Sequence, residues 1–163
     1  MQAQDTIWRA SPLLRIFVAS AFCAGLLAGA AAEMACTPGQ PHLSIEGAEV
    51  ELSPVMLGVG SVFMKIVNTG NGGDELVSAR LNIPGTTTEL HEMKDGRMAR
   101  VNRIVIPSAT TVEMKPGGPH IMVFMLPKGL GEGSKITLAL VFERSGEKMI
   151  PAELTKPRLR RGL

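Results

Sequence analysis

The chain has 163 residues and a formal net charge of +2, with 20% charged and 4% aromatic residues. Its length suits one domain and leaves little room for two. A charge this close to balance, without clusters of basic and aromatic residues, excludes nucleic acid as the expected partner.

The N-terminal segment has the features of a secretory signal peptide. Arg9 and Arg15 precede the uncharged apolar run IFVASAFCAGLLAGAAA (16–32), which ends in small residues. A basic stretch, an apolar run and an Ala-x-Ala end are typical of export signals. We therefore expect residues 1–32 to be cleaved after Ala32, which makes the mature protein periplasmic or otherwise exported. An uncleaved membrane anchor is the alternative, although 17 uncharged residues are at the short end for a membrane span.

Residues 33–42 are predicted to be a flexible leader that contains Cys36. Cys23 is lost with the signal peptide, so Cys36 has no partner for an internal disulfide. Neither cysteine has the surroundings of a good lipoprotein signal, because Phe22 directly precedes Cys23 and Glu33 lies three residues before Cys36.

Residues 43–155 predict a single all-β domain. Short alternating or apolar runs separated by Gly/Pro turns are typical of a β-sandwich or barrel, and we expect a Greek-key arrangement. The predicted strands are 43–52, 61–68, 75–81, 86–93, 98–106, 110–115, 120–126, 135–143 and 148–154. Residues 156–163 form a basic C-terminal tail, with Lys156, Arg158, Arg160 and Arg161, that we expect to be solvated.

Catalytic motifs are absent from the sequence. It has no Gly-x-Ser-x-Gly elbow, no phosphate-binding loop and no His-Glu-x-x-His helix. The carboxylates Glu89, Glu92, Asp95 and Glu113 occur where solvated strand faces and turns would place them. We therefore expect a protein that is not an enzyme.

Histidine and methionine recur together at strand spacing. His91 and Met93 are two residues apart, as are His120 and Met122, and Met98 follows the Asp95-Gly96 turn. Residues i and i+2 of a strand point to the same face. If 86–93 and 98–106 form a hairpin and residues 120–122 lie beside it, two imidazoles and two or more thioethers converge.

Such a ligand set favours Cu(I). Thioethers are soft neutral donors that suit Cu(I), whereas structural zinc sites use thiolates or additional histidines. A blue-copper centre requires a cysteine, and the only mature one, Cys36, lies in the leader. Each methionine taken alone is more simply explained by packing; this holds for Met98 and also for Met56, Met64, Met125 and Met149.

The same residues carry a family resemblance. The spacing Met98-x21-His120-x-Met122, with His91 upstream, resembles the signature of the PCuAC family of periplasmic copper chaperones. The resemblance extends over about residues 43–155 through SVFMKIVNTG, DELVSA, ELHEM and TVEMKPGGPHIMVFML. It implies a cupredoxin-like Greek-key β-barrel and the metal ligands His91, Met98, His120 and Met122.

One departure affects the fourth ligand. Six residues separate His91 from Met98, fewer than the family usually has between its first histidine and its hairpin methionine. Met93, which shares the face of His91, is therefore the alternative to Met98.

The resemblance also implies a function. Family members bind copper in the periplasm, and some supply Cu(I) to the dinuclear centre of cytochrome c oxidase. We therefore expect a monomeric Cu(I) chaperone that acts in cytochrome c oxidase assembly or copper homeostasis. Its partner would be a copper-accepting protein, such as cytochrome c oxidase subunit II or another copper chaperone, with no membrane contact beyond the N-terminal segment.

Two other hypotheses remain. A metal-free exported β-sandwich that serves in interaction or adhesion would use His91 and His120 as ordinary polar residues. A copper oxidase or monooxygenase with a histidine brace would need histidine at the mature N-terminus, where Glu33 is predicted.

Overall fold

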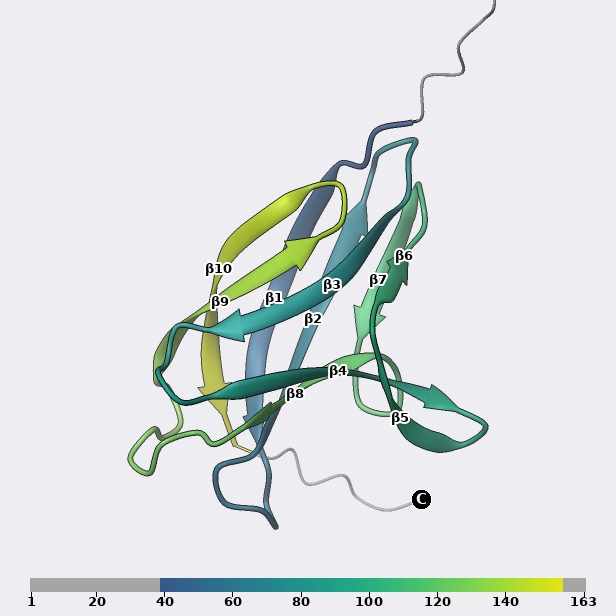
Figure 1. Ribbon diagram of the computed structural model, residues 1–163. Coiled ribbons are helices and arrows are strands. Elements are labelled where there is room, and N and C mark those ends of the chain that lie inside the picture. Colours follow the sequence, from purple (N-terminus) through teal and green to yellow (C-terminus); the bar gives the residue numbers. More distant parts are fainter. Residues whose placement is uncertain (1–38, 157–163) are drawn as a thin grey trace, which may run out of the picture. The chain divides into compact units, whose positions relative to one another are not determined.

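The computed structural model describes residues 39–156, which form a β-domain (Figure 1). The predicted signal peptide (1–32), the leader up to residue 38 and the tail from residue 157 lie outside the described residues. Within residues 39–156, no helix is long and apolar enough to cross a membrane.

Residues 39–156 contain ten strands, which make one sheet. They are β1 (Leu43–Leu52), β2 (Gly60–Asn68), β3 (Asp74–Leu81), β4 (Thr87–Lys94), β5 (Arg97–Val101), β6 (Ile104–Ile106), β7 (Thr110–Met114), β8 (His120–Phe124), β9 (Lys135–Phe142) and β10 (Gly146–Thr155). Their order is β5-β4-β8-β2-β1-β10-β9-β3-β6, and β7 also pairs with β2. Neighbours are antiparallel except for β1 and β10, which are parallel. The expected all-β class is confirmed for the described residues.

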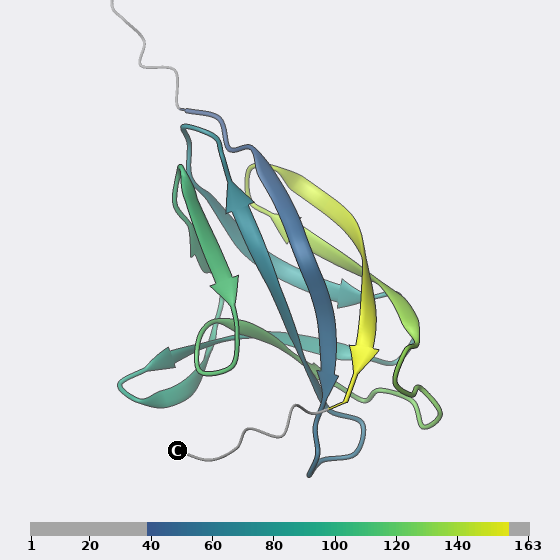
Figure 2. The ribbon, with the colours of Figure 1, turned by 180° about the vertical axis from the view of Figure 1, so that it is seen from behind.

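The sheet curls around an apolar core (Figures 1 and 2). Strand β2 shows how one face of the sheet supplies the core: Val62, Met64 and Ile66 are buried and alternate with more exposed residues. Strand β9 also buries Leu138 and Leu140, although the small Ala139 between them is buried as well. Period-two alternation places these side chains on one face, and burying that face provides the main driving force for folding.

The prediction of one strand over residues 98–106 is wrong, because this segment forms two strands, β5 and β6. The chain bends at residues 102–103. Before the bend β5 pairs with β4, and after it β6 pairs with β3. The change of partner strand explains the break, because a single straight strand could not reach both neighbours.

Asn68 ties the start of the domain to two loops. Its buried side-chain amide donates to the carbonyls of Gly72 (2.8 Å) and Pro107 (2.9 Å), and its Oδ1 accepts from the backbone N–H of His42 and Gly70 (3.0 Å each). All four hydrogen-bonding positions of the amide are used. Residues at the end of the predicted leader are thereby bonded to the β2–β3 turn.

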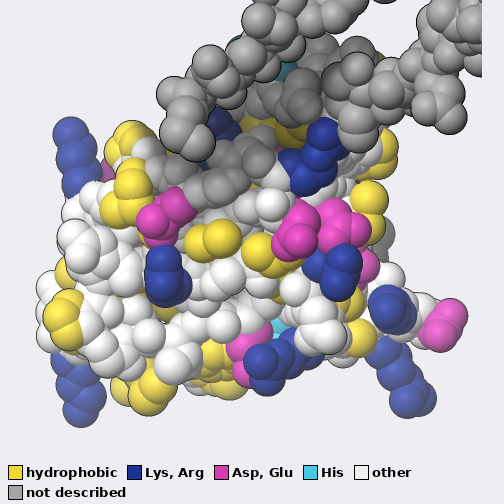
Figure 3. Space-filling view, turned by 45° about the horizontal axis from the view of Figure 1, so that its top comes forward, with side chains coloured by type: hydrophobic (Ala, Val, Ile, Leu, Met, Phe, Trp, Pro, Cys, Tyr) yellow, Lys and Arg dark blue, Asp and Glu magenta, His cyan; other side chains and the backbone are white. Residues whose placement is uncertain are grey.

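Charges are dispersed over the surface. On the face drawn in Figure 3, acidic and basic side chains lie scattered among apolar ones. Several are paired, as in Arg80–Glu147 (2.7 Å) and Lys115–Glu113 (3.1 Å). Exposed pairs of this kind contribute little to stability.

Candidate metal site

Pairing of β4 with β8 brings the two histidines of the predicted site together. His91 is the direct cross-strand partner of His120, and their ring centroids are 5.8 Å apart. The adjacent pair, Leu90 and Ile121, is buried in the core. Because side chains alternate along a strand, both imidazoles project from the opposite face of the sheet.

A two-residue turn sets the register of the β4–β5 hairpin. Asp95 and Gly96 both have positive φ (51° and 74°), as a type I′ turn requires, and Asp-Gly is a favoured sequence for it. The resulting register pairs Met93 with Met98 directly across the two strands. The two alternatives for the fourth ligand therefore lie side by side, on the same face as His91.

His120 is held in one orientation. Its Nδ1 lies 2.8 Å from the carbonyl oxygen of Gly118. A carbonyl only accepts, so Nδ1 carries the hydrogen and Nε2 keeps its lone pair. The side chain is 3% exposed and also contacts Phe63, with ring centroids 6.1 Å apart. Burial lowers the pKa of His120. The hydrogen bond to Gly118 raises the pKa, and the nearby His91 lowers it, so that the net pKa is below the ordinary value of histidine. The imidazole is thus kept neutral, as a metal ligand must be.

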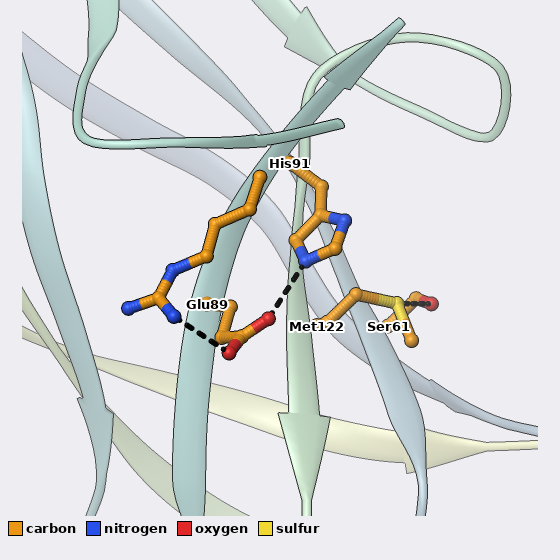
Figure 4. A network of polar contacts seen from close by, with 5 residues as sticks. Ser61, Glu89, His91 and Met122 are labelled. Carbon is orange, nitrogen blue, oxygen red and sulfur yellow. Dashed lines mark hydrogen bonds and ion pairs between the residues drawn. The ribbon is translucent and has the colours of Figure 1, made fainter. Parts of the chain in front are cut away.

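His91 is oriented by a carboxylate (Figure 4). Its Nε2 lies 3.0 Å from Oε2 of Glu89, whose other oxygen is 3.1 Å from Arg100. An ionised carboxylate only accepts, so Nε2 carries the hydrogen. The lone pair is then on Nδ1, which is buried and has no hydrogen-bond partner. A buried nitrogen without a partner is costly unless it binds something else.

Met122 completes this part of the site. It follows His120 on the same face of β8 and is the cross-strand partner of Glu89. The hydroxyl of Ser61 donates to its sulfur at 3.3 Å, which holds the thioether in position (Figure 4). Sulfur accepts such bonds weakly, so the contact orients the atom without consuming its capacity to bind a soft metal.

A cavity of about 270 Å³ opens beside these side chains. Met98, His120 and Met122 line it, and so does Met56 from the β1–β2 loop. Neither Met93 nor His91 is among the lining residues; His91 lies next to the cavity as the cross-strand partner of His120. Met98 is 51% exposed, so the cavity has buried imidazole at its floor and an accessible thioether at its edge.

The donor set fits a soft monovalent metal ion. It offers one lone pair from each imidazole and neutral thioether sulfurs, which suit Cu(I). Within the described part of the chain, no group of three or more His, Cys, Asp or Glu residues is placed to hold a metal ion. The hydrogen bonds from His91 to Glu89 and from His120 to Gly118 are of the kind that orients metal-binding histidines.

The model of a protein family matches residues 43–154, and its description reads "Putative lipoprotein LpqE-like". The chain belongs to the LpqE-like family. A relative from Leifsonia xyli subsp. xyli, named "Putative lipoprotein Lxx21020", is 29% identical over 138 residues, which are 80% of this chain and 82% of the relative.

Solved structures similar to this LpqE-like chain include PCuAC domains and the protein DR1885. The copper-bound PCuAC domain from PmoF2 has a TM-score of 0.60 at 23% identity and covers 72% of this chain and 99% of its own. The Cu(I) form of DR1885 from Deinococcus radiodurans has a TM-score of 0.58 at 21% identity, covering 82% of this chain and 89% of its own. The PCuAC-like fold implied by the sequence is confirmed, in a chain whose own family is the LpqE-like one.

Two residues near the site were not recognised from the sequence. The sequence predicts a solvated strand face for Glu89, but its carboxylate contacts His91 and Arg100. Its position two residues before His91 on the same strand is the signal that points to this contact. Met56 is expected to be a packing residue, but it is 51% exposed and lines the cavity.

The packing assignment is likewise wrong for Met125 and Met149, which are 59% and 58% exposed. It is confirmed for Met64, which is 3% exposed in the core.

Proposed function

We propose that this protein binds one Cu(I) ion through His91, Met98, His120 and Met122 and passes it to an acceptor protein. The observation that carries the proposal is the pairing of His91 with His120, in which each ring has one nitrogen hydrogen-bonded and the other free to bind. The copper-bound states of structurally similar domains support the same metal.

The arrangement suits transfer rather than catalysis. All four proposed ligands are neutral, so the bound ion keeps its single positive charge, and none of the four is the thiolate that a blue-copper electron-transfer centre needs. Transfer would proceed by ligand exchange: the exposed Met98 yields its place to a ligand of the acceptor, while His120 and Met122 still hold the ion. We therefore infer a carrier rather than an enzyme.

The acceptor and the compartment are part of the proposal. Residues 1–32 read as an export signal, and the family and its relative carry lipoprotein names, which supports an exported or envelope protein. An exported Cu(I) carrier would serve a copper-requiring protein outside the cytoplasm. Cytochrome c oxidase subunit II and another copper chaperone are the acceptors that the PCuAC resemblance implies.

Metal titration of the mature chain tests the proposal. Residues 33–163, titrated without oxygen under reducing conditions, should take up one Cu(I) per chain. Zinc should bind far more weakly, because thioethers are poor ligands for it. Failure to bind Cu(I), or zinc binding of equal strength, would favour the metal-free interaction module instead.

Substitution of the paired methionines separates the two candidates for the fourth ligand. Met98→Leu should lower Cu(I) affinity by about 10-fold, because removing even a supporting group of a metal site costs that much. Met93→Leu should leave the affinity close to that of the wild type, since Met93 does not line the cavity. Competition with a Cu(I)-specific chelator measures both. A larger loss in Met93→Leu would assign the ligand to Met93.

A further inference from the structure

The β1–β2 loop brings another methionine to the proposed copper site. Met56 lines the same cavity as Met98, His120 and Met122, although it is 42 residues before Met98 in the chain. Its side chain is 51% exposed, as is that of Met98. The cavity therefore has a half-exposed thioether from each of two separate chain segments.

The loop backbone is fixed at several points. Ser53 N–H donates to the carbonyl of Val59 at 2.8 Å and closes the loop, and the Ser53 hydroxyl accepts from the N–H of Met56 at 3.1 Å. The carbonyl of Gly58 accepts from the N–H of Leu126 at 2.9 Å, just after β8. The backbone of Met56 thus has a defined position relative to the strand that carries His120 and Met122.

The close approach of Gly58 to the backbone of Leu126 also fixes the position of the β1–β2 loop. Gly58 has a φ of +72°, and a Cβ at this residue would lie 3.2 Å from the carbonyl oxygen of Leu126. Only glycine adopts that backbone conformation without strain. The loop is therefore built to sit against the end of β8, which keeps Met56 at the cavity.

Packing in the core does not explain why a methionine occurs at position 56, because Met56 is 51% exposed. Its neighbours Val55 and Leu57 are 84% and 94% exposed, so the loop tip contributes nothing to the core. An unbranched side chain with three rotatable bonds and a polarisable sulfur can reach toward an ion in the adjacent cavity. A thioether in this place is a suitable Cu(I) donor.

We propose that Met56 is a further Cu(I) ligand, which binds the ion at the mouth of the cavity and slows its release. This inference rests on the proposed copper-carrier function. At the mouth of the cavity Met56 takes the place of His91, which does not line the cavity, so that the ion keeps four ligands: Met56, Met98, His120 and Met122. An acceptor protein that approaches the opening would displace the two accessible thioethers, those of Met56 and Met98, first.

The test replaces Met56 by leucine, which removes the sulfur and keeps an apolar side chain of similar volume. Met56→Leu should lower Cu(I) affinity by about 10-fold and speed the release of Cu(I) to a chelator. X-ray absorption spectroscopy of the loaded protein should show one sulfur ligand fewer. Met149→Leu is the matched control, because Met149 is 58% exposed on β10 and does not line the cavity.

The outcomes distinguish this inference from the function on which it rests. Equal affinity, release rate and sulfur coordination in Met56→Leu and the wild type would overturn the role of Met56, while a wild type that binds Cu(I) would leave the carrier function standing. An equal loss in Met149→Leu would also overturn it. A wild type that binds no Cu(I) would overturn both. Thermal unfolding of both variants checks that the fold is intact.

Discussion

Replacing His120 by alanine should lower the Cu(I) affinity of the protein by about 100-fold or more. Loss of a group that only supports a metal ligand costs about 10- to 100-fold, and we propose that His120 is a ligand itself. Its Nδ1 is bonded to Gly118 and its burial keeps it neutral, so no other side chain can supply the same prearranged nitrogen. Chelator competition under anaerobic conditions measures the change.

The controls separate metal binding from folding. His120 is only 3% exposed, so its removal can also destabilise the domain. Met122→Leu retains an apolar side chain of similar volume, a kind of change that usually costs less than about 1.5 kcal/mol, and it too should weaken Cu(I) binding. His42→Ala changes an exposed histidine that bonds Asn68 only through its backbone, and should bind as the wild type does. Wild-type affinity in both His120→Ala and Met122→Leu would refute the proposed site.

Asp74→Asn should destabilise the folded domain by about 3 kcal/mol, which corresponds to a fall in Tm of roughly 10 °C. Asp74 is 3% exposed, and its carboxylate accepts from the backbone N–H groups of Glu75 (2.8 Å), Arg144 (2.9 Å) and Ser145 (3.0 Å). These bonds attach the start of β3 to the β9–β10 turn. Hydrogen bonds to a charged acceptor are stronger than neutral ones, and an amide can replace only one of the two oxygens.

Asp95→Asn is the matched control for this substitution. Asp95 is exposed in the β4–β5 turn, and Asn-Gly favours the same turn as Asp-Gly. Its free energy of unfolding should stay within about 0.5 kcal/mol of the wild type. Urea denaturation measures all three proteins. Equal stability of Asp74→Asn and the wild type would show that the carboxylate does not hold this junction.

The stabilisation by Asp74 should also depend on pH. Burial raises the pKa of Asp74, but its hydrogen bonds to Ser145, Arg144 and Glu75 together lower the pKa below its ordinary value of 3.8. A carboxyl whose pKa is lower in the folded state stabilises fully above the unfolded value and loses that contribution as the pH falls through the folded value. The difference between wild type and Asp74→Asn should therefore be constant near neutral pH and shrink below 3.8.

Much of the local structure follows from short sequence patterns. Asp95-Gly96 predicts a two-residue turn, and this turn fixes the register that pairs Met93 with Met98. The i, i+2 spacing predicts that His120 and Met122 share a face, because side chains alternate along any strand. These inferences need no knowledge of distant residues, which explains why the strands and hairpin at this site were expected close to where they occur.

Other features depended on contacts that no local pattern contains. The break at residues 102–103 occurs because β5 and β6 pair with different strands. Glu89 reads as a solvated carboxylate until its partners His91 and Arg100 are known. Met56 reads as a packing residue until the loop that carries it is placed against Leu126.

The all-β class, the Asp95-Gly96 turn and the recurrence of histidine with methionine can all be read from residue type and from spacing along one strand or turn. The position of β4 beside β8, which pairs His91 with His120, and the lining of the cavity by Met98 rather than Met93 become visible in the folded chain alone. The physical reason is that strand pairing is non-local. Any two strands offer the same backbone hydrogen bonds, and the choice between them is made by burying the core of the whole sheet.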